Sequence, residues 1–135
     1  MLSIITVTFN DIALLRGTIE SVCQTDILGP WEYIVIDGNS NDGTVEYLQG
    51  VELPNLSWYS EKDSGIYDAM NKGIRFAKGD MLLFVNAGDT IKGSLNTYSL
   101  KDFDLISVTT GVRAKPYRRK SITAPFSMPY CHQGM

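Results

Sequence analysis

Four short segments of the sequence concentrate the side chains that could do chemistry, and each segment follows an apolar run. The segments are 8–10, 37–42, 61–63 and 86–89, and they supply carboxylates, amides and hydroxyls. A carboxylate at the end of a strand can accept hydrogen bonds from a base or a ribose, or bind a divalent cation. Because ligands lie beyond the carboxyl ends of the strands in α/β sheets, the four segments predict one site rather than four unrelated loops.

Two of these segments leave two interpretations open. Asp37 could accept hydrogen bonds from a base or a ribose, or it could stabilise a turn together with the Asn and Gly residues that follow it. Asp89 could coordinate Mg²⁺, which takes one or two protein carboxylates and completes its shell with phosphate and water, or it could cap a turn. A phosphate loop is excluded, because neither G-x-x-x-x-G-K-[ST] nor G-x-G-x-x-G occurs in the chain.

The third segment leads into an amphipathic helix. Asp63 and Ser64 are expected to cap this helix, and Gly79 is expected to end it. Its apolar positions, all expected to be core, are Ile66, Met70, Ile74 and Ala77. Its polar side is expected to consist of Asp68, Asn71 and Lys72, which either reach a ligand or are solvated.

Strands and helices alternate along the part of the chain that must position these segments. Short apolar or β-branched runs predict strands at 4–9, 33–36, 56–60, 81–85 and 105–108. Apolar residues at helical spacing predict a first helix with Ile12, Leu15, Ile19, Val22 and a core Cys23, and a second with Val45 and Leu48. Residues 92–99 are expected to form a loop, and 81–85 a strand covered on both faces. This order indicates an α/β domain with a mainly parallel sheet.

The composition is that of a globular chain. Its residues are 44% apolar and 20% charged, which excludes disorder, collagen-like repeats and a disulfide scaffold. A length of 135 residues corresponds to one domain or most of one. A net charge of −3 gives no reason to expect nucleic-acid binding. The longest apolar run, 81–85, is too short to span a membrane, and the N-terminus does not have the pattern of a signal peptide. With two cysteines far apart in the sequence, these features predict a cytoplasmic location.

The four segments, taken in order, match a known family. The patterns T-x-N at 8–10, V-I-D-G-x-S-x-D-G-T at 35–44, E-x-D-x-G-I-Y-D-A-M-N-K-G at 61–73 and L-x-F-x-N-A-G-D at 82–89 resemble family 2 glycosyltransferases with the GT-A fold. Within that family the chain is similar to bacterial exopolysaccharide transferases of the colanic acid type. The resemblance runs from about Ser3 to Thr90, with a weaker echo at 129–133. It implies a Rossmann-like three-layer α/β sandwich, of which this chain would be the N-terminal part.

The resemblance also implies roles for individual residues. Thr8, Phe9 and Asn10 would line the nucleotide base pocket, with Phe9 against the base. Asp37 would hold the base or ribose of a nucleoside-diphosphate sugar, and Asp63 would lie beside the nucleotide or the sugar. Asp89 would coordinate Mg²⁺ or Mn²⁺ bridging the diphosphate. Asn86 and Gly88 stand where the family often has acids, so metal affinity is expected to be low until the substrate brings its phosphates.

The implied activity is inverting transfer of a sugar to a saccharide or lipid-linked acceptor in cell-surface polysaccharide biosynthesis, from a UDP-sugar rather than a GDP-sugar. Residues 1–110 would bind the donor and 111–135 would begin the acceptor side. The general base is not identified, since Asp102 and Asp104 are the only acids after Asp89. The basic stretch 113–120 is either a solvated loop or a peripheral contact to anionic headgroups or a lipid diphosphate. The alternative is a non-catalytic nucleotide-binding α/β domain.

Overall fold

The structure is a computed structural model that describes residues 1–98. The predicted strand 105–108, the basic stretch 113–120, and the acceptor-side residues 111–135 with their 129–133 echo lie outside the described residues. Within residues 1–98, no helix is long and apolar enough to cross a membrane.

A parallel sheet of four strands forms the centre of the fold. Its strands, in the spatial order β4-β3-β1-β5, are β1 (Leu2–Thr8), β3 (Trp31–Asp37), β4 (Leu56–Ser60) and β5 (Met81–Phe84). In the register of the sheet Thr8 lies opposite Asp37, and Asp37 lies opposite Ser60. The carboxyl ends of three strands therefore meet at one edge, as the sequence predicts.

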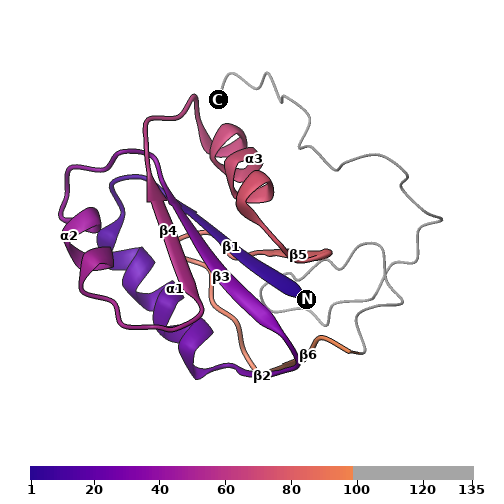
Figure 1. Cartoon of the computed structure of the whole chain (residues 1–135). Coiled ribbons are helices and arrows are strands. Elements are labelled where there is room, and N and C mark those ends of the chain that lie inside the picture. The colour runs from indigo at the N-terminus through magenta and orange to yellow at the C-terminus, as the bar shows by residue number, and fades with distance from the viewer. Residues whose placement is uncertain (99–135) are drawn as a thin grey trace.

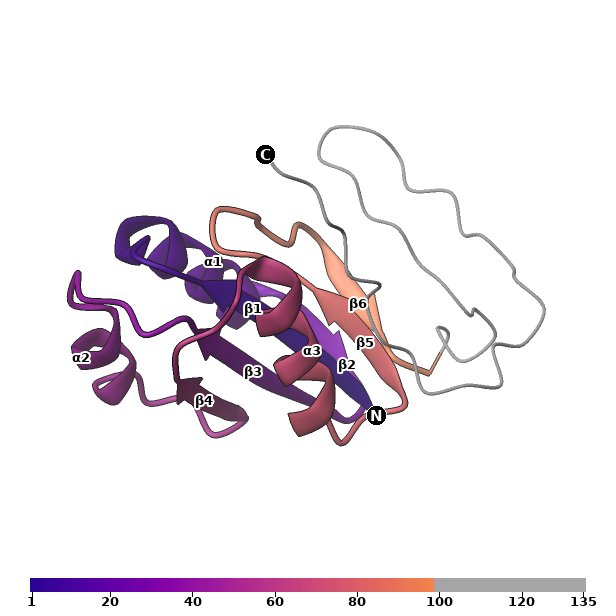
Figure 2. The ribbon, with the colours of Figure 1, turned by 90° about the horizontal axis from the view of Figure 1, so that it is seen from above.

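Three helices cover the two faces of this sheet (Figures 1 and 2). The helices are α1 (Ile12–Gln24), α2 (Thr44–Gln49) and α3 (Ile66–Phe76). One core cluster joins α1 and α2 to side chains such as Ile4 and Val35, and the other joins α3 to side chains such as Ile5 and Ile36. Alternate residues of β1 and β3 thus point into opposite layers, because side chains alternate along a strand. The arrangement is a three-layer α/β sandwich.

A second, two-stranded parallel sheet pairs β2 (Asp26–Leu28) with β6 (Ser94–Asn96). The prediction of a loop at 92–99 is therefore wrong, and β2 had no sequence signal of its own. Each strand has three residues, and only one side chain of each, Ile27 or Leu95, packs against the core. Strands this short carry too little alternation to be recognised without their partner.

Several side chains lie differently from the sequence expectation. Cys23 is exposed, because it lies about 100° around α1 from the buried Val22. Ile66 is also exposed, at the first position of α3, whereas Lys72 is buried on the inner side of the same helix. Residues 81–84 are only half-buried, although their side chains alternate between the two core clusters, because β5 is an edge strand of the described sheet.

The first turns of α3 and α1 are stabilised by contacts that differ from simple side-chain capping. α3 begins at Ile66 with Gly65 as its N-cap, one residue after the predicted Ser64. The Asp63 carboxylate accepts the Gly65 N–H at 2.9 Å, so it stabilises the turn before the helix rather than the helix end itself. α1 has Asp11 as its N-cap residue, but the side chain of that residue makes no capping hydrogen bond.

Candidate functional site

A cavity of 280 Å³ opens at the carboxyl edge of the sheet, where β1, β5 and the start of α3 meet. Its walls are formed by Val7, Thr8, Phe9, Asp11, Asp63, Gly65, Ile66, Ala69, Asn86 and Ala87. Three of the predicted site residues, Thr8, Phe9 and Asp63, therefore lie together around one space. Asn10, Asp37 and Asp89 do not line it.

Two buried oxygen atoms of this cavity have no hydrogen-bond partner within residues 1–98. They are Thr8 Oγ1, on a side chain that is 6% exposed, and Asn86 Oδ1. In folded proteins nearly all buried polar atoms are paired, because an unpaired one keeps the cost of its desolvation. Both oxygens lie on residues that line the cavity, and a ligand with donor groups would pair with them if their side chains turned toward it. The sequence placed Asn86 in one of the four predicted site segments but assigned it no role of its own.

Asp63 and Phe9 converge above the end of β3. A Cβ atom added to Gly38 would lie 2.7 Å from Asp63 Oδ2 and 3.2 Å from Phe9 Cδ2. The Gly38 N–H donates to the Thr8 carbonyl at 2.9 Å, which holds this backbone against β1. Phe9 is 60% exposed, so one aromatic surface stands beside the cavity without a core to cover it. The narrow space over Gly38 is thus set by the absence of a side chain there.

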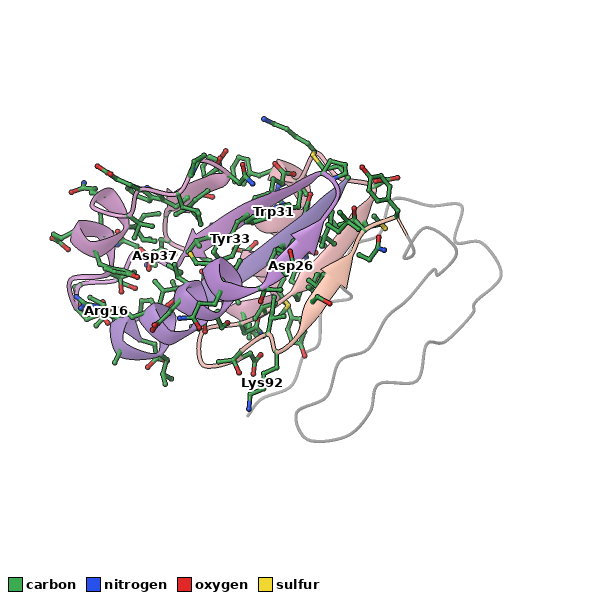
Figure 3. The ribbon with its side chains drawn as sticks, turned by 90° about the horizontal axis from the view of Figure 1, so that it is seen from below. Arg16, Asp26, Trp31, Tyr33, Asp37 and Lys92 are labelled. Atoms are coloured by element: carbon green, nitrogen blue, oxygen red, sulfur yellow. The ribbon has the colours of Figure 1, made fainter. Side chains whose placement is uncertain are left out.

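Asp37 organises the loop that follows β3. Its carboxylate is fully buried and accepts hydrogen bonds from the Ser40 N–H at 3.0 Å, from the Ser40 hydroxyl and from the Ser60 hydroxyl at 2.6 Å. Ser40 Oγ also accepts the Asn10 N–H at 2.8 Å, and Asn10 Oδ1 accepts the Asn41 N–H at 2.8 Å. The turn-stabilising interpretation of Asp37 therefore agrees with these contacts, while a direct contact with a base or ribose stays a prediction. Figure 3 labels Asp37 at the opposite end of β3 from Trp31.

Asp42 supplies the capping that α1 lacks. Its carboxylate accepts the Ile12 N–H at 2.9 Å, the Thr44 hydroxyl at 2.6 Å and the Thr44 N–H at 3.2 Å. The hydrogen bond from the Thr44 hydroxyl, followed by that from the Ile12 N–H, lowers the pKa of the Asp42 carboxyl from its usual 3.8. One carboxylate thereby holds the starts of two helices. Its contact with α1 has no local sequence signal, because Ile12 lies 30 residues from Asp42 in the chain.

The turn that carries Asp89 is held by a buried side chain of α1. The fully buried Thr18 hydroxyl lies 2.8 Å from the Asp89 carbonyl and accepts the Gly88 N–H at 3.0 Å. The Asp89 N–H closes the turn on the Asn86 carbonyl at 2.8 Å, and Gly88 has a φ of 100°, which favours glycine. The Asp89 side chain is left exposed to solvent.

The side chains of the 86–89 turn suit a divalent cation whose other ligands are phosphate oxygens and water. Among residues 1–98 there is no group of three or more His, Cys, Asp or Glu side chains that could hold a metal ion. The Asp89 carboxylate is exposed on the short turn 86–89. Mg²⁺ and similar hard cations accept such oxygen ligands together with phosphates and water. The residues present therefore fit a metal bound jointly with a diphosphate.

The sequence profile of glycosyl transferase family 2 matches residues 3–95, more than half of the chain. The chain belongs to this family. An uncharacterized glycosyltransferase of Mycobacterium tuberculosis is 47% identical over 91 residues, which cover 67% of this chain and 35% of that protein. A PGL/p-HBAD biosynthesis glycosyltransferase of Mycobacterium bovis is 36% identical over 95 residues, which cover 67% of this chain and 36% of that protein. The chain thus spans about a third of the length of these curated relatives.

Solved structures of glycosyltransferases share the fold. TarS of S. aureus in complex with UDP-GlcNAc aligns with a TM-score of 0.60 and 26% identity, over 75% of this chain and 29% of that one. The mannosyltransferase PcManGT of Pyrobaculum calidifontis aligns with a TM-score of 0.58 and 24% identity, over 64% of this chain and 27% of that one. The predicted GT-A fold class is confirmed, and the narrower resemblance to colanic acid enzymes stays a prediction.

Proposed function

We propose that this chain forms the donor-binding part of a glycosyltransferase, which moves a sugar from a nucleoside-diphosphate donor to a saccharide or lipid-linked acceptor. The observation that carries the proposal is the pair of unpaired buried oxygens, Thr8 Oγ1 and Asn86 Oδ1, at a cavity on the carboxyl edge of the sheet. Family membership supports glycosyl transfer as the reaction class. The name of the mycobacterial PGL/p-HBAD biosynthesis relative supports a biosynthetic role, which we propose to be in cell-surface polysaccharide biosynthesis.

In this proposal, different residues around the cavity contact different parts of the donor. The exposed ring of Phe9 can stack on a base, and Asp63 lies close enough to Phe9 to accept hydrogen bonds from the same ligand. Ribose or sugar hydroxyls can donate to the Thr8 and Asn86 oxygens, which removes the cost of leaving them unpaired. Asp37 and Asn10 hold the loop that follows β3, and their direct contact with the base or ribose remains part of this proposal.

The chemistry of transfer explains why a carboxylate is needed at Asp89. Negative charge grows on the leaving diphosphate as the bond to the sugar breaks, and a cation held there stabilises that charge. Asp89 would hold Mg²⁺ or Mn²⁺, and the Thr18 hydroxyl would keep the turn in place. With one carboxylate only, the cation is expected to bind together with the diphosphate rather than before it.

We further propose a UDP-sugar rather than a GDP-sugar as donor. The TarS complex holds UDP-GlcNAc and the PcManGT complex holds GDP-Man with Mn²⁺, so the choice of base rests on the direct comparison of UDP with GDP below. Inversion by a single displacement needs a general base for the acceptor hydroxyl. The two acids that follow Asp89, Asp102 and Asp104, lie outside the described residues. A cytoplasmic location, with peripheral contact between residues 113–120 and a membrane, belongs to the same proposal.

The test is calorimetry of the chain with UDP and with GDP, each with and without Mn²⁺. We expect metal-dependent binding of UDP, and we expect Asp89→Asn to lose the metal dependence. Asp26→Asn is the matched control, because Asp26 is an exposed aspartate on β2, which does not line the cavity. Binding of neither nucleotide by a folded sample would refute the donor site, and binding unaffected by Asp89→Asn would refute the metal assignment.

The second candidate function, a nucleotide-binding domain without catalysis, makes the same binding prediction. Turnover of a UDP-sugar in the presence of Mn²⁺ separates the two. Release of UDP that depends on an added saccharide or lipid-linked acceptor supports the transferase, whereas tight binding with no release supports the binding domain. The observation that favours this second candidate is that the 86–89 turn carries only one carboxylate, Asp89, and that no group of three or more possible metal ligands occurs among the described residues.

A further inference from the structure

Lys72 is the one cationic side chain that is buried among residues 1–98. It projects from the inner side of α3, and its side chain is only 9% exposed. Its Nζ donates to the Lys62 carbonyl at 2.7 Å and lies 3.1 Å from Glu61 Oε1 and 3.8 Å from Asp68 Oδ2. The helical pattern predicted that Lys72 is solvated or reaches a ligand, and its burial differs from that prediction.

The contacts of this ammonium all go to the connection that precedes α3 and to the first turn of the helix. Burying a charge is unfavourable unless it is paired and hydrogen-bonded, so packing alone does not account for a lysine at this position. The neighbouring inner positions of α3 are occupied by Ala69, Met70 and Gly73, which are buried without any charge. What the ammonium adds, compared with an apolar side chain of similar length, is an attachment for residues 61 and 62.

That attachment lies directly next to a residue of the candidate site. The Lys62 carbonyl belongs to the peptide that joins Lys62 to Asp63, so fixing this oxygen fixes the backbone from which the Asp63 side chain extends. The Asp63 carboxylate reaches across to the space over Gly38 and lines the cavity. Two local hydrogen bonds, from Gly65 N–H to Asp63 and from Ser64 N–H to Asp68, complete the turn. The Asp68 carboxylate thus touches both the turn and Lys72.

We infer that Lys72 is a positioning residue for donor binding, which acts on the ligand only through Asp63. The inference rests on the proposed function for its binding readout, and on the hydrogen bonds of the 61–65 connection for a second readout that needs no ligand. Loss of the ammonium releases the Lys62 carbonyl and the Glu61 carboxylate. The connection then samples other conformations, and the Asp63 carboxylate is no longer held over Gly38.

The ligand readout is a double-mutant cycle on UDP affinity in the full chain, with Lys72→Met, Asp63→Asn and the double variant. Methionine keeps the length and apolar stem of lysine and removes only the ammonium. We expect each single variant to weaken UDP binding about tenfold, the scale for losing one hydrogen bond to a charged group. The double variant should bind no more weakly than Asp63→Asn, because both changes remove the same interaction. Additive losses would overturn the inference.

The second readout is amide hydrogen exchange of the peptide that contains residues 61–65, measured without nucleotide. Lys72→Met should exchange faster there than the wild type, while Lys78→Met, which removes an exposed charge beyond the far end of α3, should not. If the methionine variant does not fold, Lys72→Gln replaces it with the same expected outcomes. Unchanged exchange in Lys72→Met refutes the positioning role. Faster exchange in Lys72→Met, together with a wild type that binds no UDP, leaves the hold of Lys72 on residues 61–65 intact and refutes the proposed function.

Discussion

The Thr18 hydroxyl on α1 can be separated from the Thr18 methyl group by two substitutions of similar size. Thr18→Val keeps the volume of the side chain but removes the hydrogen bonds to the Asp89 carbonyl and from the Gly88 N–H. Each such bond contributes about 1 kcal/mol net, so the variant should lose about 2 kcal/mol of unfolding free energy. Thr18→Ser keeps the hydroxyl and loses one buried methyl group, which costs about 1 kcal/mol.

Urea denaturation of both variants and the wild type measures this ordering. We expect the midpoint to fall for Thr18→Ser and to fall about twice as far for Thr18→Val, at an unchanged slope. Because the hydroxyl holds the turn that carries Asp89, only Thr18→Val should also weaken the metal-dependent part of UDP binding. A valine variant as stable as the serine variant would refute the claim that this hydroxyl fixes the turn.

Three further predictions concern backbone contacts and the helix caps. Gly38→Ala places a Cβ 2.7 Å from the Asp63 carboxylate, and since that side chain can swing away, UDP affinity measured by calorimetry should fall about tenfold while Tm barely changes; a stability loss without an affinity loss would contradict it. Gly73→Ala places a Cβ 2.5 Å from the buried Ile5 Cγ2, so overpacking should lower the unfolding free energy by about 1–3 kcal/mol in spite of better helix propensity; a raised denaturation midpoint would contradict it. The lowered pKa of Asp42 means that its carboxylate stabilises the fold above pH 3.8, and that this contribution is lost as the pH falls through the pKa of the folded state. The difference in Tm between the wild type and Asp42→Asn should therefore narrow from pH 6 to pH 3. A constant difference would show that the charge contributes nothing.

Local pattern was sufficient for the main sheet and the helices that cover it. The β-branched run at 4–9 predicts β1 to within two residues at its start, and the spacing of Leu15, Ile19 and Val22 predicts the buried stripe of α1. These signals are strong because each element buries several side chains at its own period, so the pattern repeats within the element. The same reasoning placed Thr8, Phe9 and Asp63 at one edge, and the cavity brings them together.

Contacts between distant residues decided what the local pattern did not contain. The pairing of β2 with β6 joins strands about 70 residues apart. Each strand has only one inward side chain, which is too weak a sequence signal to predict the pairing. Lys72 has the sequence environment of a solvated helix face, and it is buried because the 61–62 connection returns over α3.

The sequence by itself determined the α/β layers, the family and the polar edge. Periodicity and turn chemistry are local properties of each element, and the order and spacing of the motifs can be read along the chain. Only the tertiary structure decided which polar atoms of that edge are already paired. The Asp37 carboxylate is occupied by Ser40 and Ser60, whereas Thr8 Oγ1 and Asn86 Oδ1 have no partner within the described residues. The physical reason is that a hydrogen bond depends on where the register of the sheet and the packing of the helices place a second group, and that group is often dozens of residues away in the chain.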